Sequence, residues 1–404
     1  MTAFVNALLL QAGYNAALVG IASALLGFAA GCAGSYLFLR KRALVSDAVA
    51  HATLPGIAIA FIVMVLLGGQ GRSLVGLLFG SAVTAWIGLL AVDWITRNTR
   101  LAEDAAIGAV LSVFFGFGVV LLTVIQNMQS GRQAGLEDFL LGSTAGMLFN
   151  DAVLLAVMGA GVVALTWTFR RPMSLVAFDA EFAAANGYNT RRIDLLIMGL
   201  VMAVTVIGLK VVGLILIVAM LIIPPVTARL WTNRSENVVW IAGILGAVSA
   251  YLGAAISASA PALPTGPIIV LTAAALFVIS LLLAPARGLV AVFTRRIQFQ
   301  RRVHLRQGLL SLARQEPIHD GFTLRVLGHA GLIRADGVAT SEGKALAARI
   351  AWDERRWEVA RKVHQDSSTA GRYDGLTAIE EVFTPDEIAE FDAQIAAPTE
   401  VANQ

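Results

Sequence analysis

Cysteine and charge are both scarce in this chain. Cys32 is the only cysteine among the 404 residues, which excludes an intrachain disulfide and a thiolate metal cluster. Charged residues make up 14% of the sequence, whereas 57% of it is hydrophobic. The mean hydropathy of +0.74 lies far outside the range of a soluble enzyme of this length. The composition therefore predicts an integral membrane protein.

Two sequence signals are also absent. The chain contains no G-x-x-x-x-G-K-[ST] loop, so it cannot hold ATP by that device. Residues Met1 to Leu10 lack the basic region and the cleavage site of a secretory signal, and we expect this end not to be processed. The sequence pI is 9.2, but most excess basic residues flank apolar segments, where they set membrane orientation. We therefore expect no nucleic-acid partner.

Long apolar segments dominate the first part of the chain. A helix that crosses a bilayer needs about 20 predominantly apolar residues. Such segments lie at 15–39, 48–67, 73–95, 104–126, 150–169, 193–210, 211–231, 238–257 and 267–285. Nine crossings is the simplest interpretation, and eight stays open because the chain must fold back near Lys210 after a short run. A tight turn or a broken helix at Gly213 would allow this.

The basic residues predict the orientation of these segments. With nine crossings, nearly all the arginines and lysines of the first 296 residues fall on one side, leaving Arg72, Arg132 and Lys210 on the other. This bias marks the cytoplasmic side, so we expect the N-terminus outside and the C-terminus in the cytoplasm. Charge becomes dense after Arg296. The sequence therefore predicts a transmembrane domain at 1–290 and a cytoplasmic extension at 297–404.

One carboxylate and one imidazole stand close together in the second apolar segment. Asp47 and His51 are four residues apart, which places both on one helical face, where they can reach a single small cation. Ionisable side chains inside a span are costly, so the pair is a candidate functional site. Alternatively, Asp47 is the N-cap of a span that starts near Ala48, and His51 hydrogen-bonds a neighbouring helix. The spacing alone does not decide between these interpretations.

Four segments of the chain resemble one family. LRKRALVSDAVAHATLPGIAIA at Leu39–Ala60 resembles the permease subunits of ATP-binding-cassette importers of manganese, zinc or iron, of the ABC-3 type. FDAEFAAANG at Phe178–Gly187, VGLILIVAMLIIPPVTARL at Val212–Leu230 and LPTGPIIVL at Leu263–Leu271 resemble the same family, in the expected order. The resemblance implies an all-α polytopic membrane protein with eight or nine transmembrane helices in the bacterial inner membrane.

The same resemblance implies a set of partners and a cargo. It implies two copies of a cytosolic ATP-binding-cassette ATPase, a periplasmic or extracellular metal-binding protein, and a second permease that is a copy or a paralogue. The chain would then be a transporter subunit and not an enzyme, because ATP hydrolysis belongs to the partner. The metal would be transported cargo, and we expect no permanently bound cofactor.

The resemblance also assigns residues to these tasks. The metal ligands by position are Asp47 and His51. Carboxylate and imidazole bind first-row divalent ions, but two ligands per chain hold an ion only briefly, so two facing subunits would form a four-ligand gate. The residues that match the ATPase-coupling segment are Phe178, Asp179, Glu181, Phe182 and Gly187.

Three prolines lie inside the apolar segments. Proline removes a backbone hydrogen bond and can kink a helix. Pro55, Pro224 and Pro225 could therefore bend their helices as a transport path opens, and mere packing irregularity is an equal alternative.

The extension resembles a second family. Val303–Arg314 and Phe322–Ile333 indicate two helices, Asp336-Gly337 indicates a turn, and a strand and a long helix follow. This order is similar to the winged-helix region of manganese- or iron-dependent repressors, which implies a small α/β winged-helix-like cytoplasmic domain. The stretch DERRWE at Asp353–Glu358 lacks the histidine of those regulators. Metal sensing is therefore the less favoured role, and it stays open beside contact with the ATPase and self-association.

The most consistent interpretation is the permease of an ATP-driven importer of Mn(II), with Zn(II) or Fe(II) open because aspartate and histidine ligate all three. An ion-coupled secondary metal carrier would use Asp47 and His51 as a proton relay. A membrane-tethered metal sensor would use the extension. The segment that resembles an ATPase-docking helix favours the importer.

Overall fold

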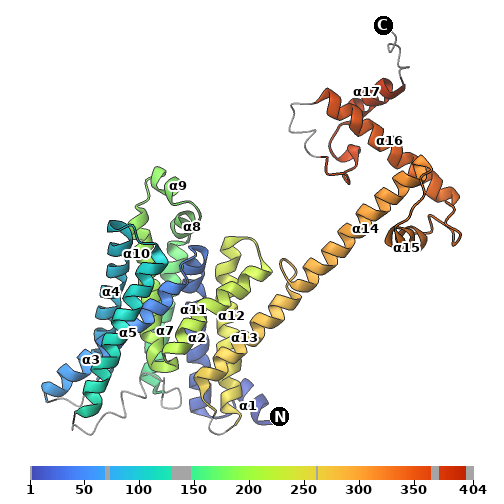
Figure 1. Ribbon diagram of the computed structural model, residues 1–404. Coiled ribbons are helices and arrows are strands. Elements are labelled where there is room, and N and C mark those ends of the chain that lie inside the picture. Colours follow the sequence, from blue (N-terminus) through green and yellow to red (C-terminus); the bar gives the residue numbers. More distant parts are fainter. Residues whose placement is uncertain (1, 69–72, 129–146, 261–262, 365–372, 397–404) are drawn as a thin grey trace. The chain divides into compact units, whose positions relative to one another are not determined.

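The computed structural model describes residues 2–68, 73–128, 147–260, 263–364 and 373–396. It divides into two compact units, Met1–Ala291 and Val292–Gln404. Both units are built of helices (Figure 1), and the long apolar helices all lie in the first unit. In the described ranges no extended strand occurs, so helices are the main regular secondary structure there.

The predicted apolar segments all form helices. These are α2 (Tyr14–Leu39), α3 (Leu44–Leu66), α4 (Leu74–Asn98), α5 (Glu103–Asn127), α7 (Phe149–Thr168), α10 (Thr190–Val212), α11 (Leu214–Trp231), α12 (Ser235–Ala258) and α13 (Thr265–Leu283). Eight of them are long and apolar enough to cross a membrane, and α11 is the shorter one. The all-α polytopic fold is therefore confirmed.

The joint between α10 and α11 is a single glycine. Gly213 has φ 77°, a left-handed conformation that glycine adopts without a Cβ clash, and it follows α10 directly and precedes α11 directly. The two helices pack against each other. Because α11 has 18 residues, it is about 27 Å long, close to the hydrocarbon thickness of about 30 Å.

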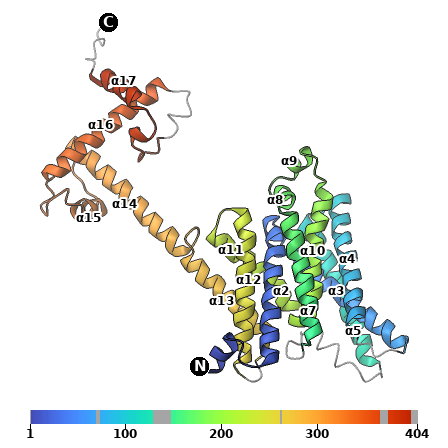
Figure 2. The ribbon, with the colours of Figure 1, turned by 180° about the vertical axis from the view of Figure 1, so that it is seen from behind.

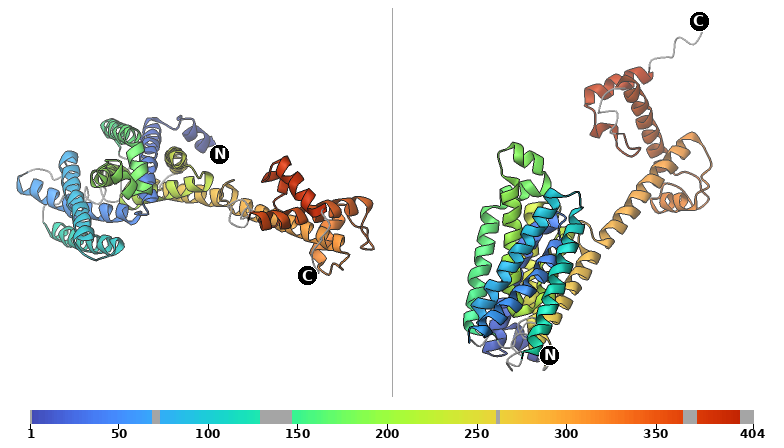
Figure 3. Two further views of the ribbon diagram at one scale, coloured as in Figure 1. Left: turned by 90° about the horizontal axis from the view of Figure 1, so that it is seen from above. Right: turned by 60° about the vertical axis from the view of Figure 1, so that its left-hand side comes forward.

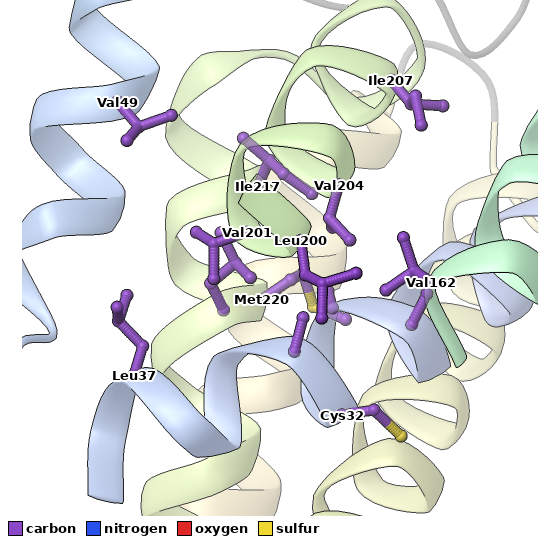
Figure 4. Packing of buried hydrophobic residues seen from close by; sticks show 14 of the residues in the cluster. Cys32, Leu37, Val49, Val162, Leu200, Val201, Val204, Ile207, Ile217 and Met220 are labelled. Atoms are coloured by element: carbon purple, nitrogen blue, oxygen red, sulfur yellow. The ribbon is translucent and has the colours of Figure 1, made fainter. Parts of the chain in front are cut away.

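Helix α2 packs in the interior of the bundle. A Cβ added at Gly27 or Gly31 would collide with the backbone carbonyl of Gly246 or Ala242, so the glycines let α2 and α12 approach closely. Apolar side chains from α2, α3, α7, α10 and α11 complete this core (Figure 4). The close helix contact explains the glycine spacing in α2.

The two ends of the bundle differ. Helices α8 (Arg170–Phe178) and α9 (Ala180–Ala185) form one end, while the short helix α1 (Thr2–Leu8) lies at the other, as Figures 1 and 2 and the right-hand view of Figure 3 show. The Tyr251 hydroxyl of α12 donates to the Leu8 carbonyl at 2.6 Å and fixes α1 there. Of the residues predicted for the outer side, Arg72 and Arg132 lie outside the described ranges.

The second unit contains most of α14 (Leu289–Arg314), followed by α15 (Gly321–His329), α16 (Ser341–Val363), the short 3₁₀ helix η3 (Ile379–Glu381) and α17 (Pro385–Ala396). The strand predicted before α16 does not form. Only an isolated antiparallel bridge joins Ile333 and Ala339, because Thr340 already caps α16 by accepting from the Gly343 amide at 3.1 Å. The α/β character expected for this unit is therefore wrong for the described residues, and the winged-helix assignment is not confirmed.

A partly buried polar network accompanies the aromatic core of this unit. Trp357 is fully buried and packs on Tyr373 and Phe383. The Tyr373 hydroxyl donates to Glu354 at 2.6 Å, and Arg306 donates to the same carboxylate at 3.0 Å. Burial, followed by the hydrogen bond to Glu354, raises the pKa of Tyr373 to about 12. This network joins α14, α16 and the segment before η3.

Candidate metal site and coupling segment

Asp47 lies inside α3 and does not cap it. The helix begins at Leu44, with Ala43 at the N-cap position, and Asp47 belongs to its first turn. The alternative in which Asp47 caps a span that starts near Ala48 is therefore wrong. The apolar segment predicted from the sequence begins at residue 48, whereas the helix itself already begins at Leu44. His51 follows one turn later on the same face, as the spacing predicts.

The two side chains approach each other directly. His51 Nε2 and Asp47 Oδ1 are 3.4 Å apart, and the side chains are 21% and 39% exposed. Two metal–ligand bonds of about 2.1 Å at angles between about 90° and 109° put their donor atoms roughly 3.0–3.4 Å apart. The separation therefore suits a single first-row cation held by both residues.

The Nδ1 side of the His51 imidazole is enclosed by protein. His51 Nδ1 is buried and, within the described ranges, has no hydrogen-bond partner. The ring meets Phe115 of α5 in a T-shaped contact at 5.0 Å between centroids. The alternative in which His51 hydrogen-bonds a neighbouring helix is thus not realised. Nε2, on the side of Asp47, is the nitrogen left to bind a ligand.

The pair is a minimal ligand set. Among the residues that the structure describes, no group of three or more histidine, cysteine, aspartate or glutamate side chains could hold a metal. Cys32 is buried in α2, where its thiol lies 3.7 Å from the Val239 carbonyl. Within the described ranges, Asp47 and His51 therefore stand as a pair without a third ligand of these types, which suits brief binding.

Pro55 lies one turn after His51 in a continuous α3. Because proline has no N–H, the His51 carbonyl loses the donor that would otherwise bond to it from position 55. Gly118 of α5 allows close packing here, since an added Cβ would lie 2.7 Å from Leu54 Cβ and 3.3 Å from Pro55 Cδ. Pro224 and Pro225 are likewise buried within a continuous α11. Their role in bending stays a prediction.

The segment predicted to dock on an ATPase forms an exposed tip. Phe178 ends α8 and Phe182 lies on α9, with 62% and 55% of their surfaces exposed. Asp179 caps α9 by accepting from the Phe182 amide at 2.8 Å, and Gly187 turns the chain with φ 84°. Glu181 is exposed in the first turn of α9. The exposed rings at the end of α8 and on the capped helix α9 form an apolar surface that suits contact with a partner.

The base of this tip carries a cluster of ion pairs around Asp194. Arg40, directly after α2, donates to the Val176 carbonyl of α8 and to Asp194 of α10, both at 2.7 Å. Arg42 pairs with Glu103 of α5 at 2.6 Å and with Asp194 at 3.5 Å. From the sequence, Asp194 is expected to pair with an arginine of the cytoplasmic side, but Arg40 and Arg42 are not identified as its partners. The signals available were Glu103 in the first turn of α5 and Asp194 shortly after the start of α10.

Comparison with known proteins adds the family. The family model described as ABC 3 transport family matches residues 14–284. The manganese transport system membrane protein MntC of Bacillus subtilis is 42% identical over 72% of this chain, and the match spans 66% of that relative's length. The zinc transport system membrane protein TroC of Treponema pallidum is 38% identical over 70% of this chain and 92% of its own.

A solved structure shows the same likeness. The structure of PsaBC from Streptococcus pneumoniae in complex with Fab is similar to this chain with a TM-score of 0.61 and 31% identity. The likeness covers 71% of this chain and 98% of that one. The family match ends at the close of α13, so α14 and the helices after it lie beyond the matched range.

Proposed function

The chain belongs to the ABC 3 transport family, and we propose that it is the membrane-spanning permease subunit of an ATP-driven importer of divalent transition-metal ions. Mn(II) is the cargo that we favour, and Zn(II) is the second candidate, since the names of the two relatives give these ions. The observation that carries the proposal is the Asp47–His51 pair, with its donor atoms 3.4 Å apart on α3.

The composition of the pair fits an ion that must be released. One carboxylate oxygen and one imidazole nitrogen suit Mn(II) and Zn(II), and two protein ligands do not form a closed structural site. A second permease facing this one would supply another two ligands. Such a shared gate forms and breaks with the approach of the two chains, which allows the ion to pass.

The coupling tip suits an ATPase partner. Phe178 and Phe182 would fill a groove on a cytosolic ATPase, with one ATPase on each of two permeases. In this proposal α8 and α9 lie in the cytoplasm and the α1 end lies on the outer face of the bacterial inner membrane, where a metal-binding protein would deliver the ion. The arginines beside α8 support this orientation.

Radiotracer uptake of manganese by cells that hold the permease with its ATPase and binding protein tests the proposal. His51→Ala and Asp47→Asn should lower uptake to the background of cells without the permease, while both variants still assemble. Asp104→Asn is the matched control, because Asp104 is an exposed acid in the first turn of α5. Normal uptake by His51→Ala would refute the gate. Uptake that continues with an inactive ATPase would identify an ion-coupled carrier.

A further inference from the structure

A cavity of about 140 Å³ opens between α2, α7, α8 and α12, away from the Asp47–His51 pair. A water molecule needs only about 10–15 Å³ in the same measure, so this space accommodates a group of several heavy atoms. Its walls include Thr166, Trp167, Arg170, Glu236 and Trp240. Nothing in the transport mechanism uses these residues.

A buried hydroxyl in the wall has no partner. Thr166 is 3% exposed, and its Oγ1 makes no hydrogen bond within the described part of the chain. A threonine in a helix can donate to the carbonyl four residues earlier, as Thr168 does to Ala164 at 2.8 Å. A buried polar atom that is left unpaired is costly, so Thr166 points to a ligand that supplies the missing hydrogen bond.

The cavity also presents one positive and one negative side chain. The Arg170 guanidinium lies over the Trp167 ring at 3.9 Å, and stacking of this kind leaves its in-plane N–H donors available. Among described residues, neither Arg170 nor Glu236 has an oppositely charged side chain within ion-pair distance. A ligand with both an anionic and a cationic group would complement both charges.

Two tryptophans indicate where the cavity opens. Trp167 and Trp240 form a T-shaped pair at 5.1 Å between centroids, and they are 48% and 37% exposed. Tryptophan side chains that are partly exposed on a membrane protein concentrate at the level of the lipid headgroups. The opening therefore faces the headgroup layer on the side of α8.

We propose that this cavity binds the headgroup of a phospholipid that carries a primary amine, as phosphatidylethanolamine does. The phosphate lies toward Arg170, the ammonium toward Glu236, and a headgroup oxygen accepts from Thr166. A primary ammonium donates hydrogen bonds to a carboxylate, whereas the quaternary ammonium of a choline headgroup cannot. The site does not depend on which ion the permease carries.

Native mass spectrometry of the full-length chain in detergent tests the site, with phosphatidylethanolamine, phosphatidylcholine and phosphatidylglycerol of identical acyl chains. We expect one phosphatidylethanolamine per chain, held about tenfold more tightly than the other two lipids. Glu236→Gln should abolish the preference over phosphatidylcholine, and Thr166→Val should weaken phosphatidylethanolamine binding severalfold. Arg170→Gln should weaken all three lipids about tenfold, whereas the exposed neighbour Arg171→Gln should leave binding unchanged.

Three results would overturn the proposal. Equal affinity of the wild-type chain for all three lipids would contradict the recognition of the ammonium group by Glu236. An equal loss in Arg170→Gln and Arg171→Gln would show that surface charge, and not the cavity, holds the lipid. Displacement of the lipid by equimolar free phosphoethanolamine would identify a soluble ligand. If Arg170→Gln does not fold, the headgroup preference of Glu236→Gln decides the question.

Discussion

Replacing Asp194 by asparagine should loosen the bundle where α2, α8 and α10 meet. The substitution keeps the shape of the side chain and removes its charge. In the wild-type chain, Asp194 accepts from Arg40 at 2.7 Å, and the two side chains are only 10% and 14% exposed. Arg42 lies 3.5 Å from the same carboxylate. The variant therefore leaves a largely buried guanidinium without its counter-charge.

The cost depends on the contacts that the two arginines keep. Removing one partner of a buried ion pair typically costs about 3–5 kcal/mol. Arg40 keeps the Val176 carbonyl, and Arg42 keeps Glu103, so we expect the low end of this range. A loss of about 3 kcal/mol corresponds to roughly a 150-fold change in the unfolding equilibrium constant.

Asp93 provides the matched control. It pairs with Arg97 and Arg191, whose side chains are 44% and 60% exposed. Water can therefore solvate both guanidinium groups when the charge of Asp93 is removed. Asp93→Asn should cost about 1 kcal/mol or less. Unfolding in mixed detergent micelles, followed by circular dichroism, measures both variants. A double-mutant cycle of Arg40→Gln and Asp194→Asn should give a coupling energy above about 1 kcal/mol. Equal destabilisation by the two aspartate variants, or a coupling energy of zero, would refute the reasoning.

Two further outcomes are expected from the contacts. The double variant Phe178→Ala and Phe182→Ala should leave the thermal melt of the permease unchanged, because both rings are mostly exposed, but it should abolish copurification of the ATPase. Phe299→Ala removes a similarly exposed ring and is the control. Copurification that persists in the double variant would contradict the docking role. In the second unit, burial alone would raise the pKa of Glu354, but hydrogen bonds from Tyr373 and Arg306 hold that pKa below its ordinary value. The stabilisation is present above that value and is lost as the pH falls through the folded pKa. Tyr373→Phe raises this pKa, so hydrogen exchange in α16 at pH 5 should be faster than in the wild-type chain, and an equal rate would contradict the network.

The sequence predicted the spans well because the bilayer dictates their length. Each of the apolar segments corresponds to one helix, with boundaries that differ by a few residues. Hydropathy reports where hydrocarbon begins, however, and not where a helix begins. For α3 the two differ: the apolar segment starts at 48, and the helix starts at Leu44. That difference decides whether Asp47 is a cap or a member of the first turn, and only the structure could decide it.

Other features depend on contacts between distant residues. Arg40 and Asp194 are separated by 154 positions, so no local pattern indicates their pairing. In the second unit, local turn chemistry was predicted and is present, since the Val338 amide bonds to Asp336 Oδ1 at 3.1 Å. The strand failed because Thr340 starts α16 directly after the bridge at Ala339. A turn signal specifies the reversal, whereas the length of the flanking strands depends on where the next helix begins.

The connection between α2 and α3 brings the tip and the ion pair into mechanical contact. Arg40 joins this corner to the last turn of α8, and Lys41, with φ 59°, turns the chain directly into α3. His51 lies seven residues after Leu44, which is about 10 Å along the helix axis. A displacement of α8 must therefore either carry the corner along or break a 2.7 Å charge-assisted hydrogen bond. Because breaking this hydrogen bond is costly, motion at the tip is transmitted to the Asp47–His51 pair through only a few bonds. Asp194→Asn weakens the same corner. This variant should therefore lower the amount of metal transported per ATP hydrolysed.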